Sequence, residues 1–397
     1  HRSWARNARL TSMVSDNING QRIIKAFSKE DEELDRFDTV SSDLYEADLK
    51  LNNSEATLFP VLTILLSMLA VVMLTFGGLM VANGEMTVGT LLNFTVYLTM
   101  LVGPLDFLSW VSNWWARCVD SAQRVFEIVD AKPEIVEKEH PIEIGEVRGD
   151  IEISKLEFEY EPAQPVIKNL DLKVNAGQML GIVGKTGAGK TTIANLIARL
   201  YDPKAGCVKI DGVDVRDLPL DTIRKNVGLV SQDIYLFIGT IADNIRYAKP
   251  DATMDEIIAA AKAASAHDFI MKLPDAYETR VGAGGHDLSG GERQRISIAR
   301  TIIQNPRILI LDEATAAMDT ETERNIQYSL TKLMQGRTTV AIAHRLSTLR
   351  DADMLAVISE GEVVEYGSYA ELLKKRGEFY KLYKIQAEAL KAVGIID

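Results

Sequence analysis

The strongest constraint on this chain is one glycine-rich stretch that matches the phosphate-binding pattern G-x-x-x-x-G-K-[ST] at every fixed position. An apolar segment with strand character precedes it at 178–183, and helical spacing follows it at 192–200. The stretch reads Gly184-Lys185-Thr186-Gly187-Ala188-Gly189-Lys190-Thr191-Thr192. Its glycines let successive backbone N–H groups point inward, and the following helix adds the positive end of its dipole. We therefore predict a polyphosphate site rather than a glycine-rich turn without a ligand.

Two side chains of this stretch have expected roles. Lys190 would reach the β- and γ-phosphates, and the hydroxyl of Thr191 would be a ligand of Mg²⁺. The predicted ligands are therefore a nucleotide polyphosphate and Mg²⁺.

Length and charge narrow the class of protein. At 397 residues the chain is long enough for two or three domains, and its net charge of −12 disfavours a nucleic-acid partner. The two cysteines, Cys118 and Cys207, are far apart and indicate neither a disulfide framework nor a metal site. The chain opens at His1 without a signal peptide and in mid-pattern, as expected of a piece of a longer protein.

Ionisable side chains are absent between residues 56 and 84. Within that stretch, residues 58–82 are almost wholly apolar and, at about 1.5 Å per residue, long enough to cross a hydrocarbon core about 30 Å thick. A polar turn at 83–85 leads into a second uncharged run. We predict two membrane spans, at 58–82 and 88–112, within a partial transmembrane domain over 1–130.

Lysine and arginine residues precede the first span and follow the second, but the turn at 83–85 has neither. The positive-inside rule therefore places both ends in the cytoplasm. A buried hairpin of a soluble protein is the alternative, disfavoured because two adjacent runs of this length are rare in soluble folds. Asp106 lies in the second predicted span, either on a translocation pathway or, as we prefer, wetted at the cytoplasmic side. Residues 11–48 have the apolar spacing of an amphipathic helix, interrupted near Asn19-Gly20.

After a proline- and glutamate-containing linker at 131–150, polar residues follow several predicted strands. The apolar run 308–311 ends in Asp312 and Glu313, at the end of a strand where an α/β sheet places its chemistry. Asp312 suits a Mg²⁺ shell, and Glu313 suits polarising a water for attack on a γ-phosphate. An acidic pair that only caps the next helix is the simpler alternative.

Four further features belong to the same predicted site. Gln232 and His344 each end a predicted strand, and the amide of Gln232 could contact Mg²⁺ or the attacking water. Leu288-Ser289-Gly290-Gly291-Glu292 opens a helix whose first N–H groups could bind an anion. Tyr160, at a strand end, could stack on a nucleotide base, although an aromatic there is more often part of the core.

Taken in order, these motifs resemble the nucleotide-binding domain of ATP-binding cassette (ABC) transporters, whose signature is Leu-Ser-Gly-Gly-Glu. The resemblance covers nearly the whole chain, because 17–27 looks like a coupling segment of the exporters and the two spans look like their fifth and sixth helices. It implies a multi-domain protein: a partial α-helical membrane domain, then an α/β P-loop nucleotide-binding domain at 151–390 with an antiparallel β-subdomain and a helical subdomain.

The resemblance also implies roles for individual residues. Tyr160 would stack on adenine, Glu313 would be the catalytic base, His344 would contact the γ-phosphate, and Gln232 would be the glutamine-loop residue. Asp319 belongs to the same family set. ATP would lie between the phosphate stretch of one chain and Ser289, Gly290 and Gly291 of a second half-transporter, as a homodimer or heterodimer.

Three departures from the family pattern stand out. Ala283-Gly284 replaces a usual Glu-Arg, Ala316-Ala317-Met318-Asp319 replaces Ser-Ala-Leu-Asp, and two spans are found where a half-transporter has six. The first puts in doubt the contact from that loop to the opposite coupling helix.

The expected function is ATP-driven export of an unidentified substrate by a multi-pass protein of the cell membrane, with lipid as a further partner and the nucleotide-binding domain in the cytoplasm. A membrane-bound ATPase with a regulatory or structural role is the first alternative. A soluble cassette ATPase of the chromosome-maintenance or repair type is the second, and the two uncharged runs argue against it.

Overall fold

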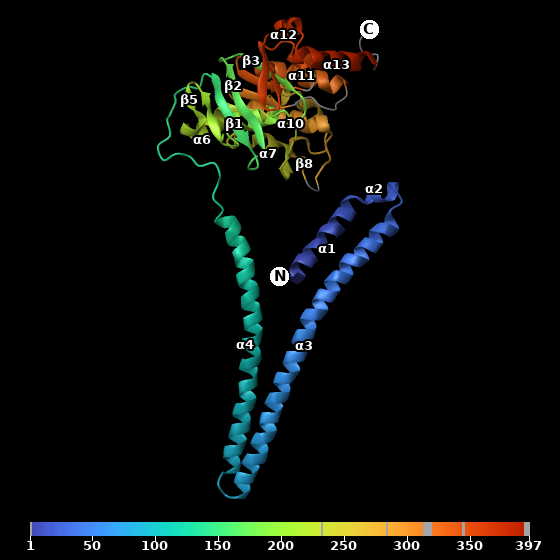
Figure 1. Ribbon diagram of the computed structural model, residues 1–397, viewed down its shortest axis with the longest axis vertical. Coiled ribbons are helices and arrows are strands. Elements are labelled where there is room, and N and C mark those ends of the chain that lie inside the picture. The colour runs from blue at the N-terminus through green and yellow to red at the C-terminus, as the bar shows by residue number, and fades with distance from the viewer. Residues whose placement is uncertain (1, 232, 283–284, 313–319, 344–345, 393–397) are drawn as a thin grey trace. The chain divides into compact units, whose positions relative to one another are not determined.

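The computed structural model describes residues 2–231, 233–282, 285–312, 320–343 and 346–392 (Figure 1). The chain divides into two compact units, His1–Ala131 and Lys132–Asp397. The first unit is helical, and the second combines sheets with helices. The fold class is therefore the one expected, a helical part followed by an α/β domain.

The described part of the first unit consists of four helices. They are α1 (Arg2–Asn19), α2 (Gln21–Ala26), α3 (Glu30–Ala82) and α4 (Val88–Val129). Gly20 lies at the expected break, where a Cβ would come within 3.0 Å of the carbonyl oxygen of Asp16. Helix α1 runs beside the first part of α3 (Figure 1) and buries Met13, Val40 and Ala47 there.

Helices α3 and α4 form a hairpin. Acidic residues at 30–33 lie in the first turn of α3, where they stabilise the positive end of its dipole. Thr87 caps α4, because its hydroxyl accepts a hydrogen bond from the N–H of Thr90 at 3.2 Å. Close to the turn, a Cβ on Gly77 would lie 2.4 Å from Cδ1 of Leu91, so the two helices are in tight contact there.

A search of the described residues for a helix with both the length and the apolar character of a membrane span found none.

The second unit contains a largely parallel sheet that, among the described residues, has the strand order β12-β11-β3-β10-β9-β6. Strands β11, β3, β10, β9 and β6 run parallel, and β12 is antiparallel at the edge. The strands span β3 (Met179–Gly184), β6 (Val227–Val230), β9 (Ile308–Asp312), β10 (Thr338–Ile342), β11 (Met354–Ser359) and β12 (Glu362–Gly367). Residues 308–312 of β9 are all buried, as the unbroken apolar run predicts for a strand covered on both faces.

Several helices precede or follow the strands of this sheet in the sequence. They are α5 (Lys190–Ile197), α6 (Leu220–Asn226), α11 (Thr320–Met334), α12 (Tyr369–Lys375) and α13 (Glu378–Ala392). Residues 184–192 form the phosphate loop, and its last three residues are the first three of helix α5.

An antiparallel sheet with the order β2-β1-β4-β5 forms a second layer of this unit within the described residues. Its strands are β1 (Ile151–Glu159), β2 (Pro165–Val174), β4 (Ala205–Ile210) and β5 (Val213–Asp214). The buried side chains of β1, β2 and β4 share one apolar core with α5 and with one face of the parallel sheet. This core therefore packs against α5, the helix that the phosphate loop leads into.

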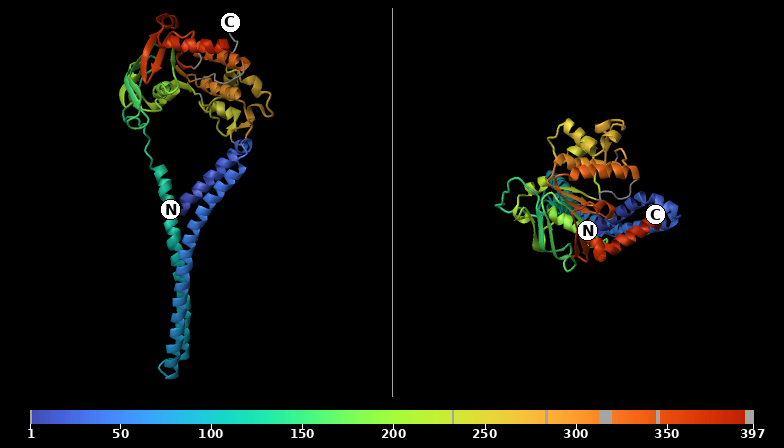
Figure 2. Two further views of the ribbon diagram at one scale, coloured as in Figure 1. Left: turned by 45° about the vertical axis from the view of Figure 1, so that its right-hand side comes forward. Right: turned by 90° about the horizontal axis from the view of Figure 1, so that it is seen from above.

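A group of helices forms the helical subdomain. It contains α7 (Ile241–Arg246), α8 (Met254–Ala263), α9 (His267–Ile270) and α10 (Gly290–Gln304), with the short strands β7 (Gly239–Thr240) and β8 (Arg280–Val281). Figure 2 shows these yellow to orange helices and the green strands β1 and β2 at opposite sides of the second unit. The alanine-rich sequence of residues 255–273 predicts one helix, but the segment is divided in two because Ser265 has a φ of +54° between α8 and α9.

Candidate functional site

The phosphate loop connects the centre of the parallel sheet to α5. Gly187 and Gly189 have φ values of +82° and +98°, a region that side chains with a Cβ rarely adopt. A Cβ on Gly184 would lie 2.3 Å from the carbonyl oxygen of Ile358, and one on Gly189 would lie 2.6 Å from Cδ1 of Ile167. The glycines of the motif are therefore required by this backbone, which curls around the start of α5.

Lys190 is the first residue of α5, and its side chain is folded into the loop. Its Nζ donates hydrogen bonds to the carbonyl oxygens of Gly184 and Lys185, both at 3.0 Å, and the residue is 6% exposed. Thr191 is exposed, whereas Thr192 is buried. The loop thus holds an ammonium group and an accessible hydroxyl beside the helix N-terminus, as the polyphosphate interpretation requires.

Tyr160 directly follows β1 and is 49% exposed. Its hydroxyl donates a hydrogen bond to Oγ1 of Thr192 at 3.2 Å. Its ring packs edge to face against Phe158 and Tyr201, with centroids 4.8 and 5.1 Å away. Tyr160 therefore touches the phosphate loop through one end of the ring and keeps about half of its surface accessible, so a base could stack on it.

The parallel strands bring the remaining predicted site residues to one edge of the sheet. In register, Val230 of β6 pairs with Leu311 of β9, and Asp312 of β9 pairs with Ile342 of β10. Strand β10 also pairs in parallel with β3. The carboxyl ends of these four strands therefore meet at the edge that carries the phosphate loop, which is where an open α/β sheet binds ligands.

Asp312 is described at this edge and is 4% exposed. The other predicted catalytic residues, Gln232, Glu313 and His344, lie outside the described residues, and so does Asp319. Along the chain Gln232 comes two residues after β6, Glu313 one after β9, and His344 two after β10. The departures from the family pattern at 283–284 and 316–319 also lie outside the described residues.

The signature segment, residues 288–292, starts α10 with a reciprocal cap. The hydroxyl of Ser289 accepts a hydrogen bond from the N–H of Glu292 at 3.3 Å, and the Glu292 carboxylate accepts one from the N–H of Ser289 at 2.8 Å. Leu288 is buried at 4% exposure, and a Cβ on Gly290 would meet open space. The segment therefore presents the capped N-terminus of a 15-residue helix, with open space at Gly290.

Among the described residues, no group of three or more His, Cys, Asp or Glu side chains could hold a metal ion. The expected Mg²⁺ shell would not form such a group, because it contains one carboxylate, Asp312, with the hydroxyl of Thr191 and the amide of Gln232. A buried carboxylate and an exposed hydroxyl at one sheet edge fit a hard cation that takes oxygen ligands.

Comparison with known proteins identifies the family. The sequence model described as "ABC transporter" matches residues 167–316, and the one described as "ABC transporter transmembrane region" matches residues 1–105. A solved structure of a bacterial Atm1-family ABC exporter with ATP bound superposes with a TM-score of 0.87 at 34% identity, covering 97% of this chain and 68% of that one. The chain belongs to the ABC exporter family.

Curated relatives of this ABC exporter chain include proteins named for lipidic molecules. The ATP-dependent lipid A-core flippase of Syntrophus aciditrophicus is 44% identical over 95% of this chain and 63% of its own length. A fatty acid ABC transporter ATP-binding/permease protein of Mycobacterium bovis is 39% identical over 96% of this chain and 60% of its own length. The chain therefore spans about three fifths of the length of these relatives.

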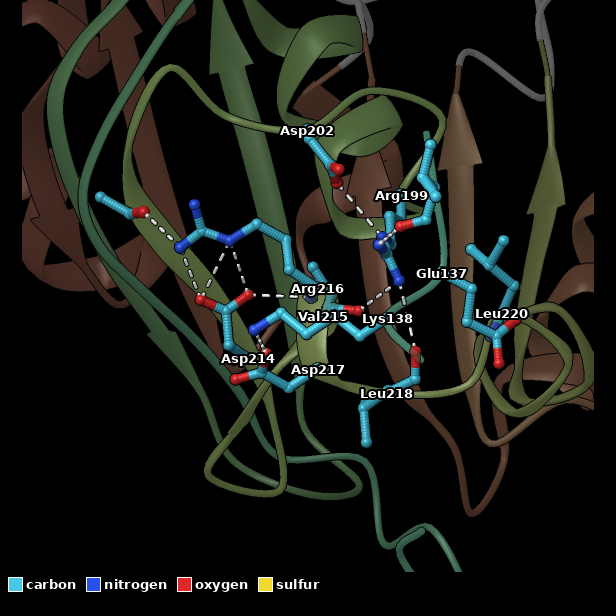
Figure 3. Close-up of polar contacts among 12 residues, drawn as sticks. Glu137, Lys138, Arg199, Asp202, Asp214, Val215, Arg216, Asp217, Leu218 and Leu220 are labelled. Carbon is cyan, nitrogen blue, oxygen red and sulfur yellow. Dashed lines mark hydrogen bonds and ion pairs between the residues drawn. The ribbon is translucent and has the colours of Figure 1, made fainter. Parts of the chain in front are cut away.

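One buried residue of this exporter chain was not found from the sequence. Arg199, just after α5, is 3% exposed and has a φ of +49°. Its guanidinium donates to the carbonyl oxygens of Val215, Leu218 and Val136 at 2.8, 3.3 and 3.2 Å, and it pairs with Asp202 at 3.2 Å (Figure 3). The sequence offered one signal for this burial, which is that Arg199 continues the apolar face of the helix predicted at 192–200.

Through the carbonyl oxygen of Val136, Arg199 thereby attaches the linker at 131–150 to the carboxyl end of α5. Around it, Lys138 pairs with Asp217, and Glu137 accepts a hydrogen bond from the N–H of Leu220 at 3.4 Å (Figure 3). The neighbouring Asp214 accepts hydrogen bonds from Arg216. Burial by itself would raise the pKa of Asp214, but the hydrogen bonds from the Arg216 side chain and backbone hold this pKa below its ordinary value.

Proposed function

We propose that this chain is the ATP-hydrolysing subunit of an exporter that moves an unidentified substrate across a membrane. The observation that carries the proposal is the sheet edge at which the phosphate loop, the buried Asp312 and the strands leading to Gln232 and His344 meet. Membership of the ABC exporter family supports coupling of this site to transport.

In this proposal the phosphate loop holds the triphosphate of ATP. Lys190 exchanges its two carbonyl partners for phosphate oxygens, because its ammonium is attracted more strongly to an anionic phosphate oxygen than to a neutral carbonyl oxygen. Tyr160 offers its exposed ring surface to the adenine. Thr191, Gln232 and Asp312 would hold Mg²⁺, which neutralises charge on the β- and γ-phosphates when bound.

Chemistry at the γ-phosphate is assigned to residues that follow the strand ends. Glu313 orients the attacking water and takes its proton, and Gln232 and His344 contact the water and the γ-phosphate. The backbone position supports this assignment, since Glu313 is bonded to the last residue of the buried strand β9.

We also propose that the site is completed by a second copy or a related chain. The signature segment starts α10 with open space at Gly290, and it lies on the helical subdomain rather than on the strand ends that bear the phosphate loop. A helix N-terminus of this kind suits the γ-phosphate of an ATP held by the opposite chain.

The membrane part of the proposal rests on the first unit. Residues 58–82 of α3 and 88–112 of α4 are proposed as two spans, with the turn between them outside and the nucleotide-binding domain in the cytoplasm. The match of residues 1–105 to a transmembrane region supports this placement, with lipid as the surrounding partner.

The test compares Glu313→Gln with the wild type in the full-length protein reconstituted in lipid. We expect the variant to bind ATP with unchanged affinity and to lose steady-state hydrolysis, because an amide accepts no proton from the attacking water. Glu362→Gln, an exposed glutamate on β12, is the matched control and should hydrolyse ATP normally. Retained hydrolysis in Glu313→Gln would refute the role of Glu313, and a wild type without ATPase activity would refute the proposed function.

A further inference from the structure

Helix α10 carries a partly buried arginine, Arg300, in its last turns rather than at the signature end. Arg300 donates from Nε to the carbonyl oxygen of Asn244 at 2.9 Å and from Nη2 to Oδ1 of the same residue at 3.0 Å. Its Nη1 donates to the carbonyl oxygen of Tyr235 at 3.3 Å. One guanidinium therefore binds two points of the segment 235–247, which follows β6 in the chain.

Asn244 makes this attachment rigid. It is 1% exposed, its Oδ1 accepts from the N–H of Phe237 at 2.9 Å, and its Nδ2 donates to the carbonyl oxygens of Phe237 and Thr240 at 2.9 and 3.0 Å. The side chain thus closes the turn between residues 237 and 244, while its amide oxygen also accepts from Arg300. A fully satisfied buried amide of this kind fixes the conformation of the turn.

Two aromatic rings complete the environment of Arg300. Phe237 and Tyr247 stack at 4.3 Å with an interplanar angle of 17°, and the guanidinium carbon lies 5.7 Å from each ring centroid. These named partners of Arg300 are neutral carbonyl, amide and aromatic groups. Burial lowers the pKa of Arg300 from its ordinary value, but a guanidinium stays charged at neutral pH. Because no carboxylate is among these named partners, the contribution of Arg300 here is the fixed geometry of its planar hydrogen-bond donors.

The opposite end of α10 is attached to a different element. Arg295 donates to the carbonyl oxygen of Ser265, between α8 and α9, at 3.1 Å, and its guanidinium lies 4.6 Å from the Phe269 ring. It also donates to the carbonyl oxygen of Gly291, in the signature segment, at 3.3 Å. Helix α10 is therefore fixed at its signature end by Arg295 and to the segment 235–247 by Arg300.

We propose that Arg300 is a positioning residue that makes the segment 235–247 and the signature segment move as one body when ATP binds. The observation that supports this proposal is the set of three hydrogen bonds from one guanidinium on α10 to Tyr235 and Asn244. The inference rests on the proposed function, and it adds a link between the chain that follows Gln232 and the helix that faces the partner's ATP. Arg300 is not proposed to touch ATP itself.

Arg300→Lys is the informative variant. A lysine keeps the charge and most of the aliphatic stem, but a single ammonium cannot reproduce the planar fork that reaches Tyr235 and both Asn244 oxygens. Arg224→Lys, at an exposed position on α6, is the matched control for the same chemical change. Both variants are prepared in the full-length protein in lipid bilayer discs, and the folded fraction of each is measured first.

Amide hydrogen exchange of 235–247 and of 288–292 is then measured with and without ATP in a Glu313→Gln background. With Arg300 or in the Arg224→Lys control, we expect ATP to protect both segments together. In Arg300→Lys, we expect protection of 288–292 to remain and the ATP response of 235–247 to disappear. An ATP response of 235–247 in Arg300→Lys equal to that of the control would overturn the proposal.

Steady-state kinetics provides the second readout. Per folded molecule, Arg300→Lys should lower kcat about fivefold, the size of effect seen for residues that couple distant elements, with KM for ATP changed less than about twofold. Unchanged kcat, or a parallel loss of ATP affinity, would refute the coupling role. A wild type that shows the exchange response without hydrolysis would refute the proposed function but leave the coupling by Arg300 supported.

Discussion

Arg199 gives the sharpest prediction about the stability of the nucleotide-binding domain. Its guanidinium is 1% exposed in the side chain, and two of its acceptors belong to Val215 and Leu218, which are 0% and 1% exposed. Arg199→Ala leaves both carbonyl oxygens without this donor and removes the ion pair with Asp202. Leaving a buried polar group unsatisfied costs about 1 to 3 kcal/mol, so we expect a total loss of about 3 kcal/mol in the free energy of unfolding.

Arg216 is the matched control, because it lies beside Arg199 and also pairs with an aspartate (Figure 3). Its side chain is 36% exposed, so water can replace much of what Arg216→Ala removes. An exposed ion pair of this kind contributes at most about 1 kcal/mol.

The assay is urea unfolding of the full-length protein in lipid, followed by pulse proteolysis of the second unit. With an m-value of about 3 kcal/mol/M, Arg199→Ala should lower the urea midpoint by about 1 M and Arg216→Ala by about 0.3 M or less. Equal shifts for the two variants would refute the reasoning that burial of the guanidinium decides its contribution.

Three further predictions concern the phosphate loop and the helical subdomain. Tyr160→Ala should weaken ATP binding measured by calorimetry while kcat is retained. Tyr160→Phe should bind ATP nearly normally, because it keeps the ring and loses only the hydroxyl. Unchanged ATP affinity in the alanine variant would mean that Tyr160 has a purely structural role. Gly189→Ala should abolish ATP binding, and Gly187→Ala should reduce it less. Both glycines have positive φ, but only a Cβ on Gly189 meets a neighbouring atom, at 2.6 Å. Equal losses of ATP affinity in the two variants would contradict this reasoning. Burial raises the pKa of Tyr277 from 10.0 to about 12. The folded state therefore binds more protons than the unfolded state between these values, and stability should fall as pH rises from 10 to 12. Tyr277→Phe should remove that part of the fall in denaturant titrations, and an identical pH dependence would exclude this source.

The sequence predicted the parts of the site that depend on local geometry. The phosphate loop needs glycines at fixed places, and the structure shows why at Gly184 and Gly189, where a Cβ would meet neighbouring atoms. The order of apolar strands predicted that Asp312 would end a buried strand, and parallel register then brings the strand ends to one edge. The ABC exporter family was also predicted and is confirmed by the comparisons.

Contacts between distant segments could not be predicted in the same way. Arg199 and Arg300 have no spacing motif, and most of their partners are backbone carbonyl oxygens 16 to 65 positions away, which leave no mark in residue types. The break at Ser265 was missed because alanine-rich flanks favour a continuous helix, whereas tertiary packing of α8 and α9 favours a turn. The roles of Gln232, Glu313, Asp319 and His344, and the two membrane spans, stay predictions.

Sharing of each ATP site between two chains can be tested directly by mixing two variants. Lys190→Ala and Ser289→Ala are made separately in a Glu313→Gln background, and ATP retained after washing is measured for each variant alone and for the two mixed after co-expression. If the phosphate loop of one chain works with the signature segment of the other, mixed dimers, about half of the population under random assembly, contain one intact site and retain ATP. ATP retained by the mixture but by neither variant alone is the predicted result. No retention in mixed dimers whose formation has been verified by two affinity tags would contradict the claim.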